Sequence, residues 1–382
     1  MITTIHIDNF KSLVDFRVNL SKFSCLVGLN GAGKSTVLQA MDFLSQLMRG
    51  DLNSWLSERS WEKADLNSKL SARLNIEFEV TLQLDSLGEF VWSGSVNRNS
   101  LHCTTETALL NGEPLLKVQE GECTLRTNGS KADKFKVVFE YQGSILSQLK
   151  ESQIKGPLLA LRNELLKVHS LDLLSPAQLR MKTRNADGQL GLGGQRLSAY
   201  LHELGKDKRE TLKNRLAGVY GQLESIDTKS LRSGWKQLGI KERFGNQLLS
   251  TPAEHINDGM LRLMAVLSQL DSDQHFLIFD EIENGINPEL VEFLVDALVG
   301  SNHQVLVTTH SPLILNYLED DTAKKGVIYL YKTPEGATQA IPLFSIPSMA
   351  EKLSVMGPGE VFVDTHLLEL AAEISEMEGG KQ

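Results

Sequence analysis

Apolar and polar residues alternate along much of the first 144 residues, and this period of two is typical of β-strands. The alternation is strictest in Leu74–Leu84, where every second residue from Ile76 onward is apolar. Because the other positions stay polar, we expect an antiparallel sheet with one solvated face. Strands are predicted at Ile2–Ile7, Phe16–Leu20, Phe23–Val27, Leu74–Leu84, Phe90–Val96 and Phe135–Tyr141, and a helix at Lys34–Met48.

The pattern changes in the middle of the chain. From about Ile145 to Gly245, leucines recur at the i, i+3 and i+4 spacing of a helix, and the polar, glycine-rich stretch Asn185–Gly194 interrupts them. No heptad register persists over several repeats, so a long coiled coil is not expected. The pattern therefore predicts a helical insertion over residues 145–250.

After residue 250, predicted helices and strands alternate, as expected of a parallel α/β sheet. Together with residues 1–144, this part is expected to form one α/β domain, a nucleotide-binding sheet built from both ends of the chain (residues 1–144 and 251–382). The predicted elements are a helix at Asp258–Leu270, a strand at Phe276–Asp280, a helix at Pro288–Val299, a strand at Gln304–Thr308, a helix from Pro312, a strand at Val327–Tyr331 and a helix at Thr365–Met377.

Composition narrows the class of protein. The chain has 39 Lys and Arg residues against 48 Asp and Glu residues, a net charge of -9, which argues against a basic surface spread over the whole protein. Cys25, Cys103 and Cys123 lack C-x-x-C spacing, so neither a disulfide framework nor a zinc site is predicted. The N-terminus has no secretion signal, and no apolar run approaches the ~20 residues that span a bilayer. We therefore expect a cytoplasmic protein without a membrane anchor.

Residues 28–36, with the sequence GLNGAGKST, fit the phosphate-binding pattern G-x-x-x-x-G-K-[ST] between a predicted strand and a predicted helix. Glycines let successive N–H groups point at phosphate oxygens, Lys34 would neutralise the β- and γ-phosphates, and Ser35 would ligate Mg²⁺. A chance match is expected in roughly one to two per cent of chains this long. The predicted ATP-binding residues of this P-loop are Gly28, Asn30, Gly31, Ala32, Gly33, Lys34, Ser35 and Thr36.

Two later strands end in residues that can complete such a site. The apolar strand Phe276–Asp280 ends in Asp280 and Glu281, the Walker B arrangement in which Asp280 would hold Mg²⁺ and Glu281 would polarise the attacking water. The alternative is a strand that simply runs into an acidic turn. His310 follows the strand Gln304–Thr308, which we expect beside the Walker B strand, so that His310 lies near the γ-phosphate. An ordinary surface histidine is its alternative.

These motifs follow one another in a recognisable order. N-F-K-S near the start, G-L-N-G-A-G-K-S-T, D-G-M-L-R-L, F-L-I-F-D-E-I-E-N-G-I-N-P and V-T-T-H-S-P resemble the ABC-type ATPase heads of the SMC and RecF kind. The chain looks most similar to the compact bacterial AAA ATPases related to OLD-family (overcoming lysogenization defect) proteins. The resemblance implies an ABC-type P-loop ATPase head with an antiparallel β lobe and a helical insertion.

In such families two heads enclose two ATP molecules, and a short serine-glycine motif of one head contacts the γ-phosphate bound by the other. The matching residues here are Asn257, Asp258 and Gly259, with Asn257 in place of the serine. Capping of the following helix is an equally good interpretation of them.

The resemblance further assigns Lys11 and Ser12 to the edge of the nucleotide base. It also requires a Mg²⁺-sensing glutamine, for which Gln142 is the candidate, with a surface glutamine as its alternative.

The resemblance implies an ATP- and Mg²⁺-dependent ATPase that dimerises around ATP and controls a partner, with anti-phage defence as the first setting and DNA repair as the second. Too few residues follow Val327–Tyr331 for a nuclease domain of ~100 residues, so a nuclease or toxin effector is expected on a separate chain. An ATP-gated scaffold or inhibitor with little hydrolysis is one alternative. Direct DNA binding through Arg180, Lys182 and Arg184 is another.

Overall fold

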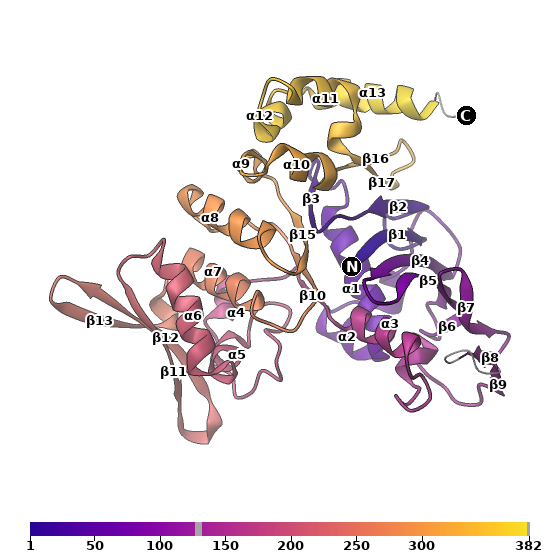
Figure 1. Ribbon diagram of the computed structural model, residues 1–382, viewed down its shortest axis with the longest axis horizontal. Helices are drawn as coiled ribbons and strands as arrows, with labels where there is room; N and C mark the ends of the chain where they lie inside the picture. The colour runs from indigo at the N-terminus through magenta and orange to yellow at the C-terminus, as the bar shows by residue number, and fades with distance from the viewer. Residues whose placement is uncertain (127–131, 380–382) are drawn as a thin grey trace.

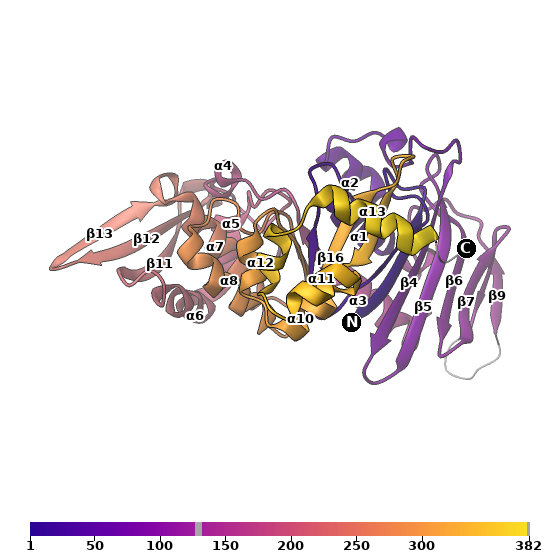
Figure 2. The same ribbon diagram turned by 90° about the horizontal axis from the view of Figure 1, so that it is seen from above.

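The computed structural model describes residues 1–126 and 132–379. The molecule is elongated, with an antiparallel β lobe at one end, a central α/β core, and an arm at the other end (Figures 1 and 2). The arm is defined here as residues 176–252, which run from α4 to β13. Both ends of the chain contribute to the core, as the sequence predicts.

The core contains a six-stranded sheet with the order β10-β14-β15-β3-β16-β17. The first five strands are parallel to one another, and β17 runs antiparallel to β16 at the edge. The predicted parallel α/β sheet is therefore confirmed. Its strands are β3 (Phe23–Val27), β10 (Val168–Leu171), β14 (Phe276–Phe279), β15 (Gln304–Thr308), β16 (Val327–Lys332) and β17 (Thr338–Pro342).

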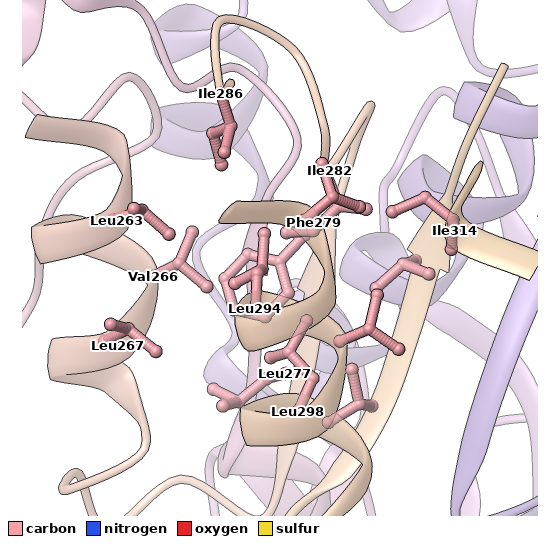
Figure 3. Packing of buried hydrophobic residues seen from close by; sticks show 14 of the residues in the cluster. Leu263, Val266, Leu267, Leu277, Phe279, Ile282, Ile286, Leu294, Leu298 and Ile314 are labelled. Atoms are coloured by element: carbon pink, nitrogen blue, oxygen red, sulfur yellow. The ribbon is translucent and has the colours of Figure 1, made fainter. Parts of the chain in front are cut away.

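Helices cover both faces of this sheet, which explains why its central strands are continuous apolar runs. In β14, Leu277 and Phe279 join the hydrophobic cluster shared with α7 and α8, while Phe276 and Ile278 join the cluster shared with α1. Each such side chain contributes about 1.5–3 kcal/mol when it is fully buried. The three helices are α1 (Lys34–Arg49), α7 (Asp258–Gln269) and α8 (Pro288–Val299). Figure 3 shows the first cluster, with Leu263, Val266 and Leu267 of α7 facing Leu294 and Leu298 of α8.

The β lobe is an eight-stranded antiparallel sheet with the order β2-β1-β4-β5-β6-β7-β8-β9. The predicted antiparallel sheet is confirmed, but β6, β7 and β8 were not predicted, and the strand expected at Phe135–Tyr141 is reduced to β9. Val138 and Phe139 beyond β9 are exposed, so apolar character there does not reflect a buried strand face. The strands are β1 (Ile2–Asp8), β2 (Phe16–Asn19), β4 (Asn75–Leu84), β5 (Gly88–Asn97), β6 (Cys103–Leu110), β7 (Glu113–Gln119), β8 (Glu122–Leu125) and β9 (Asp133–Lys136).

The predicted insertion contains helices, but it is not helical throughout. Residues 145–250 include the core strand β10 and most of a separate antiparallel sheet, β11-β12-β13. Few apolar side chains are buried within that sheet: Leu223 and Ile226 on β11, and Leu238 and Ile240 on β12. Because there are so few, the apolar and polar residues do not alternate clearly enough to predict strands. The elements of this region are α3 (Pro157–Leu166), α4 (Pro176–Leu179), α5 (Leu197–Glu203), α6 (Gly205–Ala217), β11 (Leu223–Ser230), β12 (Lys236–Phe244) and β13 (Gln247–Pro252).

Most of the remaining helices are short, and α10 to α13 lie together beyond one edge of the sheet (Figure 1). Cys25, Cys103 and Cys123 are buried and free. In the described parts of the chain, none of the helices has the length and apolar character that crossing a membrane requires. The short helices are α2 (Leu52–Glu58), α9 (Pro312–Asn316), α10 (Asp320–Gly326), α11 (Pro347–Leu353) and α12 (Pro358–Val363), and the longer last helix is α13 (Leu367–Gly379).

Candidate functional site

The P-loop, the Walker B acids and His310 follow three strands that are neighbours in the core sheet. β15 lies between β14 and β3, and all three run in the same direction. Their carboxyl ends therefore meet at one edge of the sheet, which is where open α/β sheets bind ligands. The prediction that the strand before His310 lies beside the Walker B strand is confirmed.

The P-loop needs glycine at two positions. At Gly28, with φ of 147°, a Cβ atom would lie 2.4 Å from the carbonyl oxygen of Leu330, and at Gly33, with φ of 109°, it would lie 2.3 Å from Oγ1 of Thr338. Side chains at these positions would push the loop away from β16 and β17. Helix α1 begins directly after the loop, so its free N–H groups and dipole favour an anion here.

Lys34 is folded back into the loop. Its Nζ donates hydrogen bonds to the carbonyl oxygens of Gly28 at 2.8 Å and Leu29 at 3.2 Å. Burial lowers the pKa of Lys34, while the charges of Asp280, Glu281 and Glu283 act in the opposite direction. Three carboxylates thus face one ammonium group across the site.

Two side chains that the sequence analysis did not assign hold the Walker B turn. The Thr308 hydroxyl donates to Oδ1 of Asp280 and accepts a hydrogen bond of 2.8 Å from the Glu281 N–H. Arg262 of α7 donates to the carbonyl oxygens of both Asp280 and Glu281 at 2.8 Å. Glu281 itself has a φ of 44°, a left-handed conformation that costs a non-glycine residue energy and that these contacts hold in place.

The Glu281 carboxylate lies between two polar side chains. Its Oε1 is 3.8 Å from Nε2 of His310, and its Oε2 accepts a hydrogen bond of 3.1 Å from Nδ2 of Asn284. The two residues that were predicted to act on the γ-phosphate and its attacking water are therefore adjacent. A water molecule held by Glu281 would lie within reach of His310.

Glu283 connects this turn to the loop that carries His310. Its Oε1 accepts hydrogen bonds from the backbone N–H of His310 at 2.9 Å and of Ser311 at 3.1 Å. Its Oε2 is buried and has no hydrogen-bond partner among the described residues. The carboxylate of Glu283 thus sets the position of the histidine loop relative to the Walker B turn.

The residues present fit a magnesium ion. Ser35 offers a hydroxyl oxygen in the first turn of α1, and Asp280 offers a carboxylate at the end of β14. Mg²⁺ is typically held by one or two protein oxygens together with substrate phosphates and water. A cation would also offset the three carboxylates that face Lys34. When bound, the ion would neutralise charge that builds up on the phosphates.

The prediction of Gln142 as a metal ligand is wrong for this structure. Its Oε1 accepts a hydrogen bond from the Asn53 N–H at 3.0 Å, and the neighbouring Ser144 N–H bonds to the carbonyl oxygen of Leu47, near the end of α1. Leu47 is twelve residues beyond Ser35, which is about 18 Å along the helix axis. Gln142 does not reach the P-loop, because the chain after the β lobe packs against the end of α1 that is farther from the P-loop.

Lys11 and Ser12 lie on the P-loop side of the β lobe but have different surroundings. Lys11 Nζ donates to Oε1 of Gln39 at 2.9 Å and lies 3.1 Å from the centroid of the Trp61 ring. Burial, followed by the charge of Arg59, lowers the pKa of Lys11 to about 8. Ser12 Oγ is 2.8 Å from Oγ1 of Thr338, the threonine that packs on Gly33. Their contact with a nucleotide base stays a prediction.

Asn257 and Asp258 are exposed at the N-terminus of α7, where a second subunit could reach them. The Asn257 side chain accepts a hydrogen bond from the Met260 N–H at 2.8 Å, so it caps the helix. Gly259 approaches the Walker B turn closely, since a Cβ there would lie 2.8 Å from the carbonyl oxygen of Gly285. Capping is thus observed, and the contact in trans stays a prediction.

The three basic residues predicted to bind DNA each have an intramolecular partner. Arg180 donates to Asp258 and to the carbonyl oxygen of Ile256, at 2.7 Å for the latter. Lys182 is 2.9 Å from Oε1 of Glu254, and Arg184 lies over the Trp235 ring at 5.2 Å. Arg180 and Lys182 are thus paired with acids beside the start of α7, whereas Arg184 is exposed and packs on an aromatic ring. Binding of DNA by the three residues stays a prediction.

Sequence reasoning missed Arg262, Thr308, Thr338 and Glu283 as parts of the site. Arg262 belongs to the stretch D-G-M-L-R-L, and Thr308 and Glu283 belong to two other motifs that carry the family resemblance. Membership in these motifs is the signal that could have identified the three residues. Thr338 begins the short edge strand β17, and no sequence pattern indicated its contact with the P-loop.

Comparison with known proteins agrees with this geometry. Residues 1–173 match a family model described as an AAA ATPase domain, and residues 186–316 match one described as "AAA domain, putative AbiEii toxin, Type IV TA system". No curated protein is similar enough in sequence to be matched.

Solved structures of SMC heads share the fold. An SMC head bound to the C-winged helix domain of ScpA is 14% identical with a TM-score of 0.57, over 89% of this chain and 97% of that chain. The SMC head domain with an extended coiled coil from Pyrococcus furiosus is 13% identical with a TM-score of 0.56, over 92% and 99%. The nearer resemblance to OLD-family proteins stays a prediction. The chain therefore has the fold of an SMC-type ABC ATPase head, and two separate parts of it match models of AAA ATPase domains.

Proposed function

We propose that the chain binds ATP with Mg²⁺, hydrolyses it, and uses the ATP-bound state to form a dimer of heads that controls a separate effector protein. The observation that carries the proposal is the convergence of Lys34, Asp280, Glu281 and His310 at the carboxyl ends of three adjacent parallel strands. A phosphate chain in the P-loop would extend toward the Walker B turn, where a base and a cation-binding carboxylate lie next to each other.

In the proposed reaction each side chain has one task. Lys34 exchanges its two carbonyl partners for β- and γ-phosphate oxygens, and Ser35 and Asp280 hold the Mg²⁺. Glu281 accepts a hydrogen bond from the attacking water and orients it, while His310 donates to the γ-phosphate. Thr308 and Arg262 keep the Walker B turn in its left-handed conformation, so that the Glu281 carboxylate stays aimed at the water.

Replacing Lys34 by Ala should weaken ATP binding by roughly 10- to 100-fold, since a charge-assisted hydrogen bond of this kind is worth about 1.5–3 kcal/mol. Equilibrium titration with a fluorescent ATP analogue measures the change. Lys22→Ala is the matched control, because Lys22 is an exposed lysine at the opposite end of β3. Equal affinities for the two variants would refute the role of Lys34.

Two substitutions of Glu283 test its hold on the histidine loop. Glu283→Ala removes the acceptor of both backbone N–H groups and should lower kcat about tenfold, whereas Glu283→Gln keeps an oxygen at Oε1 and should retain most of the turnover. The KM for ATP should change little in either variant. Steady-state ATPase assays compare them, and an equal loss of kcat in both would contradict a positioning role.

Anti-phage defence is the setting we propose, with a cytoplasmic location and an effector nuclease or toxin on a separate chain. Support comes from the family model that names a toxin and a toxin–antitoxin system, and from the SMC heads that are described as bound to a domain of ScpA. The test is the plating efficiency of phages on bacteria that produce the chain with the products of its neighbouring genes. Protection that persists in the Lys34→Ala variant would overturn ATP control of the effector.

An ATP-gated scaffold with little hydrolysis is the second candidate. The observation that favours it is Asn257, whose side chain replaces the usual serine and is already used as the cap of α7. Steady-state ATPase activity of the purified wild-type protein separates the two functions. Control of the effector without measurable turnover would favour the scaffold.

A further inference from the structure

A cavity of about 610 Å³ lies between the core and the arm, away from the P-loop. One wall is the second half of α1, where Asp42, Gln46 and Arg49 face the cavity, and another is the end of α2. β10, α3 and the glycine-rich loop at residues 189–196 of the arm form the remaining sides. Arg49 lies fourteen residues beyond Ser35, which places it about 21 Å from the phosphate end of α1.

Cationic side chains from three different elements line this cavity: Arg49 from α1, Arg162 from α3 and Arg196 from the loop before α5. Arg49 donates through Nη2 to the carbonyl oxygen of Leu166 at 3.2 Å. Arg196 donates through Nη1 to the carbonyl oxygen of Ala186 at 3.3 Å. The same nitrogen lies 3.7 Å from Oδ2 of Asp187, which is a long ion pair. Arg162 is largely paired, since it donates to the carbonyl oxygens of Leu146 and Leu149 and to Glu151. Much of the hydrogen-bonding capacity of Arg49 and Arg196 is still available to a ligand.

Three buried nitrogens on cavity-lining residues have no hydrogen-bond partner within residues 1–126 and 132–379: Nε of Arg49, Nε of Arg162 and Nε2 of His169. His169 as a whole residue is only 9% exposed. Buried polar atoms are nearly always paired, because an unpaired one costs about 1–3 kcal/mol. The two guanidinium nitrogens can only donate, so they indicate a ligand with hydrogen-bond acceptors. Burial and the charge of Arg49 lower the pKa of His169 to about 4, so its neutral ring donates or accepts through Nε2 according to its tautomer.

Carboxylates also line the cavity, and most of their capacity is already used. Asp42 accepts hydrogen bonds from Arg59, Trp55 and Gln46 through its two oxygens. Asp51 caps α2 by accepting from the Ser54 N–H. Glu58 remains as an exposed acid at the rim. Asp51 and Glu58 are exposed, whereas the atoms left unpaired among the described residues in the buried part of the cavity are nitrogens of Arg49, Arg162 and His169.

We propose that this cavity is a second ligand site that binds a small phosphate-bearing anion through Arg49 and His169 of the core and Arg196 of the arm. Its volume is in the range of ordinary small-molecule sites, about 300–1,000 Å³. Because the donors belong to both the core and the arm, the bound anion joins the two parts at the far end of the helix that begins at the P-loop. The site does not depend on ATP hydrolysis, so it can be tested separately from the proposed function.

The experiment uses the full chain carrying Lys34→Ala, which weakens the P-loop site, and titrates it with sodium pyrophosphate by calorimetry. Pyrophosphate should bind, and adding Arg49→Gln or Arg196→Gln should weaken its binding about tenfold or more. Arg17→Gln is the matched control, since Arg17 is an exposed arginine on β2. Arg196→Gln changes a partly exposed side chain, so it keeps the test valid where Arg49→Gln fails to fold.

A second titration identifies the source of the phosphate. ATP that displaces pyrophosphate from the Lys34→Ala protein, and that loses this ability in the Arg196→Gln background, supports a nucleotide as the ligand. Pyrophosphate binding that ATP does not displace, but that still depends on Arg196, supports a free polyphosphate. No binding of either compound to the Lys34→Ala protein, or affinities unchanged by both Arg49→Gln and Arg196→Gln, would overturn the proposal.

Discussion

Glu281→Gln should lower the turnover number for ATP by roughly 10²- to 10⁴-fold, the usual contribution of a general base, while ATP binding persists. The amide has nearly the same shape as the carboxylate and can still accept from Nδ2 of Asn284, but it cannot take a proton from water. Steady-state ATPase assays give kcat, and titration with a fluorescent ATP analogue gives the affinity. Wild-type turnover in this variant would remove Glu281 from the mechanism.

The same variant tests the dimer. With hydrolysis blocked, ATP should accumulate between two heads, so size-exclusion chromatography with light scattering should report twice the monomer mass in ATP and the monomer mass without it. Adding Asp258→Lys at the exposed start of α7 should prevent this shift if that surface meets the second subunit. Glu292→Gln is the matched control for both measurements, because Glu292 is an exposed acid on α8.

Asp172→Ala should lower the free energy of unfolding by about 3–5 kcal/mol, because it leaves a buried guanidinium group partly unpaired. Arg59 donates to both oxygens of Asp172 at 2.8 Å and to Asp42 at 2.6 Å, and the three side chains are almost entirely buried. Burial alone would lower the pKa of Arg59, but its hydrogen bonds and ion pairs with Asp172 and Asp42 raise it instead. The network joins α1, the residue after α2 and the end of β10.

Urea unfolding followed by far-UV circular dichroism measures this loss, and tryptophan fluorescence reports locally, since Arg59 lies near the rings of Trp55 and Trp61. Glu79→Ala is the control, because it removes an exposed partner 3.6 Å from Arg17 and should cost less than about 1 kcal/mol. A loss equally small for Asp172→Ala would mean that water or Asp42 alone satisfies Arg59.

The parts of the site that could be predicted are those coded by contiguous residues. Residues 28–36 carry the turn, the helix start and the phosphate ligands in one stretch, so a local pattern was sufficient. The apolar strands before Asp280 and His310 were visible for the same reason, and the placement of β15 beside β14 followed from motif order. The prediction of Gln142 as a metal ligand failed because it depended on where the chain rejoins the core after the β lobe, which is a long-range property.

The arm shows where prediction from the sequence was insufficient. Its sheet has so few buried apolar positions that the leucines of α5 and α6 dominate the pattern, and the region was predicted as helical. The side chains that Arg180, Lys182 and Arg184 contact could not be predicted either, since each lies more than fifty residues away along the chain. A run of basic residues does not indicate whether its charges face solvent or neighbouring acids.

By itself, the sequence determined that this protein has a P-loop, a Walker B pair and a histidine at strand ends, because each is a local arrangement of backbone conformation and side-chain chemistry. Only the tertiary structure decided what holds them in place. Thr338 packs on Gly33, Arg262 and Thr308 fix the turn at Glu281, and Glu283 holds the histidine loop. These contacts join segments that are far apart in the chain. The segments come together because they pack on the same buried sheet, and no local sequence pattern encodes that packing.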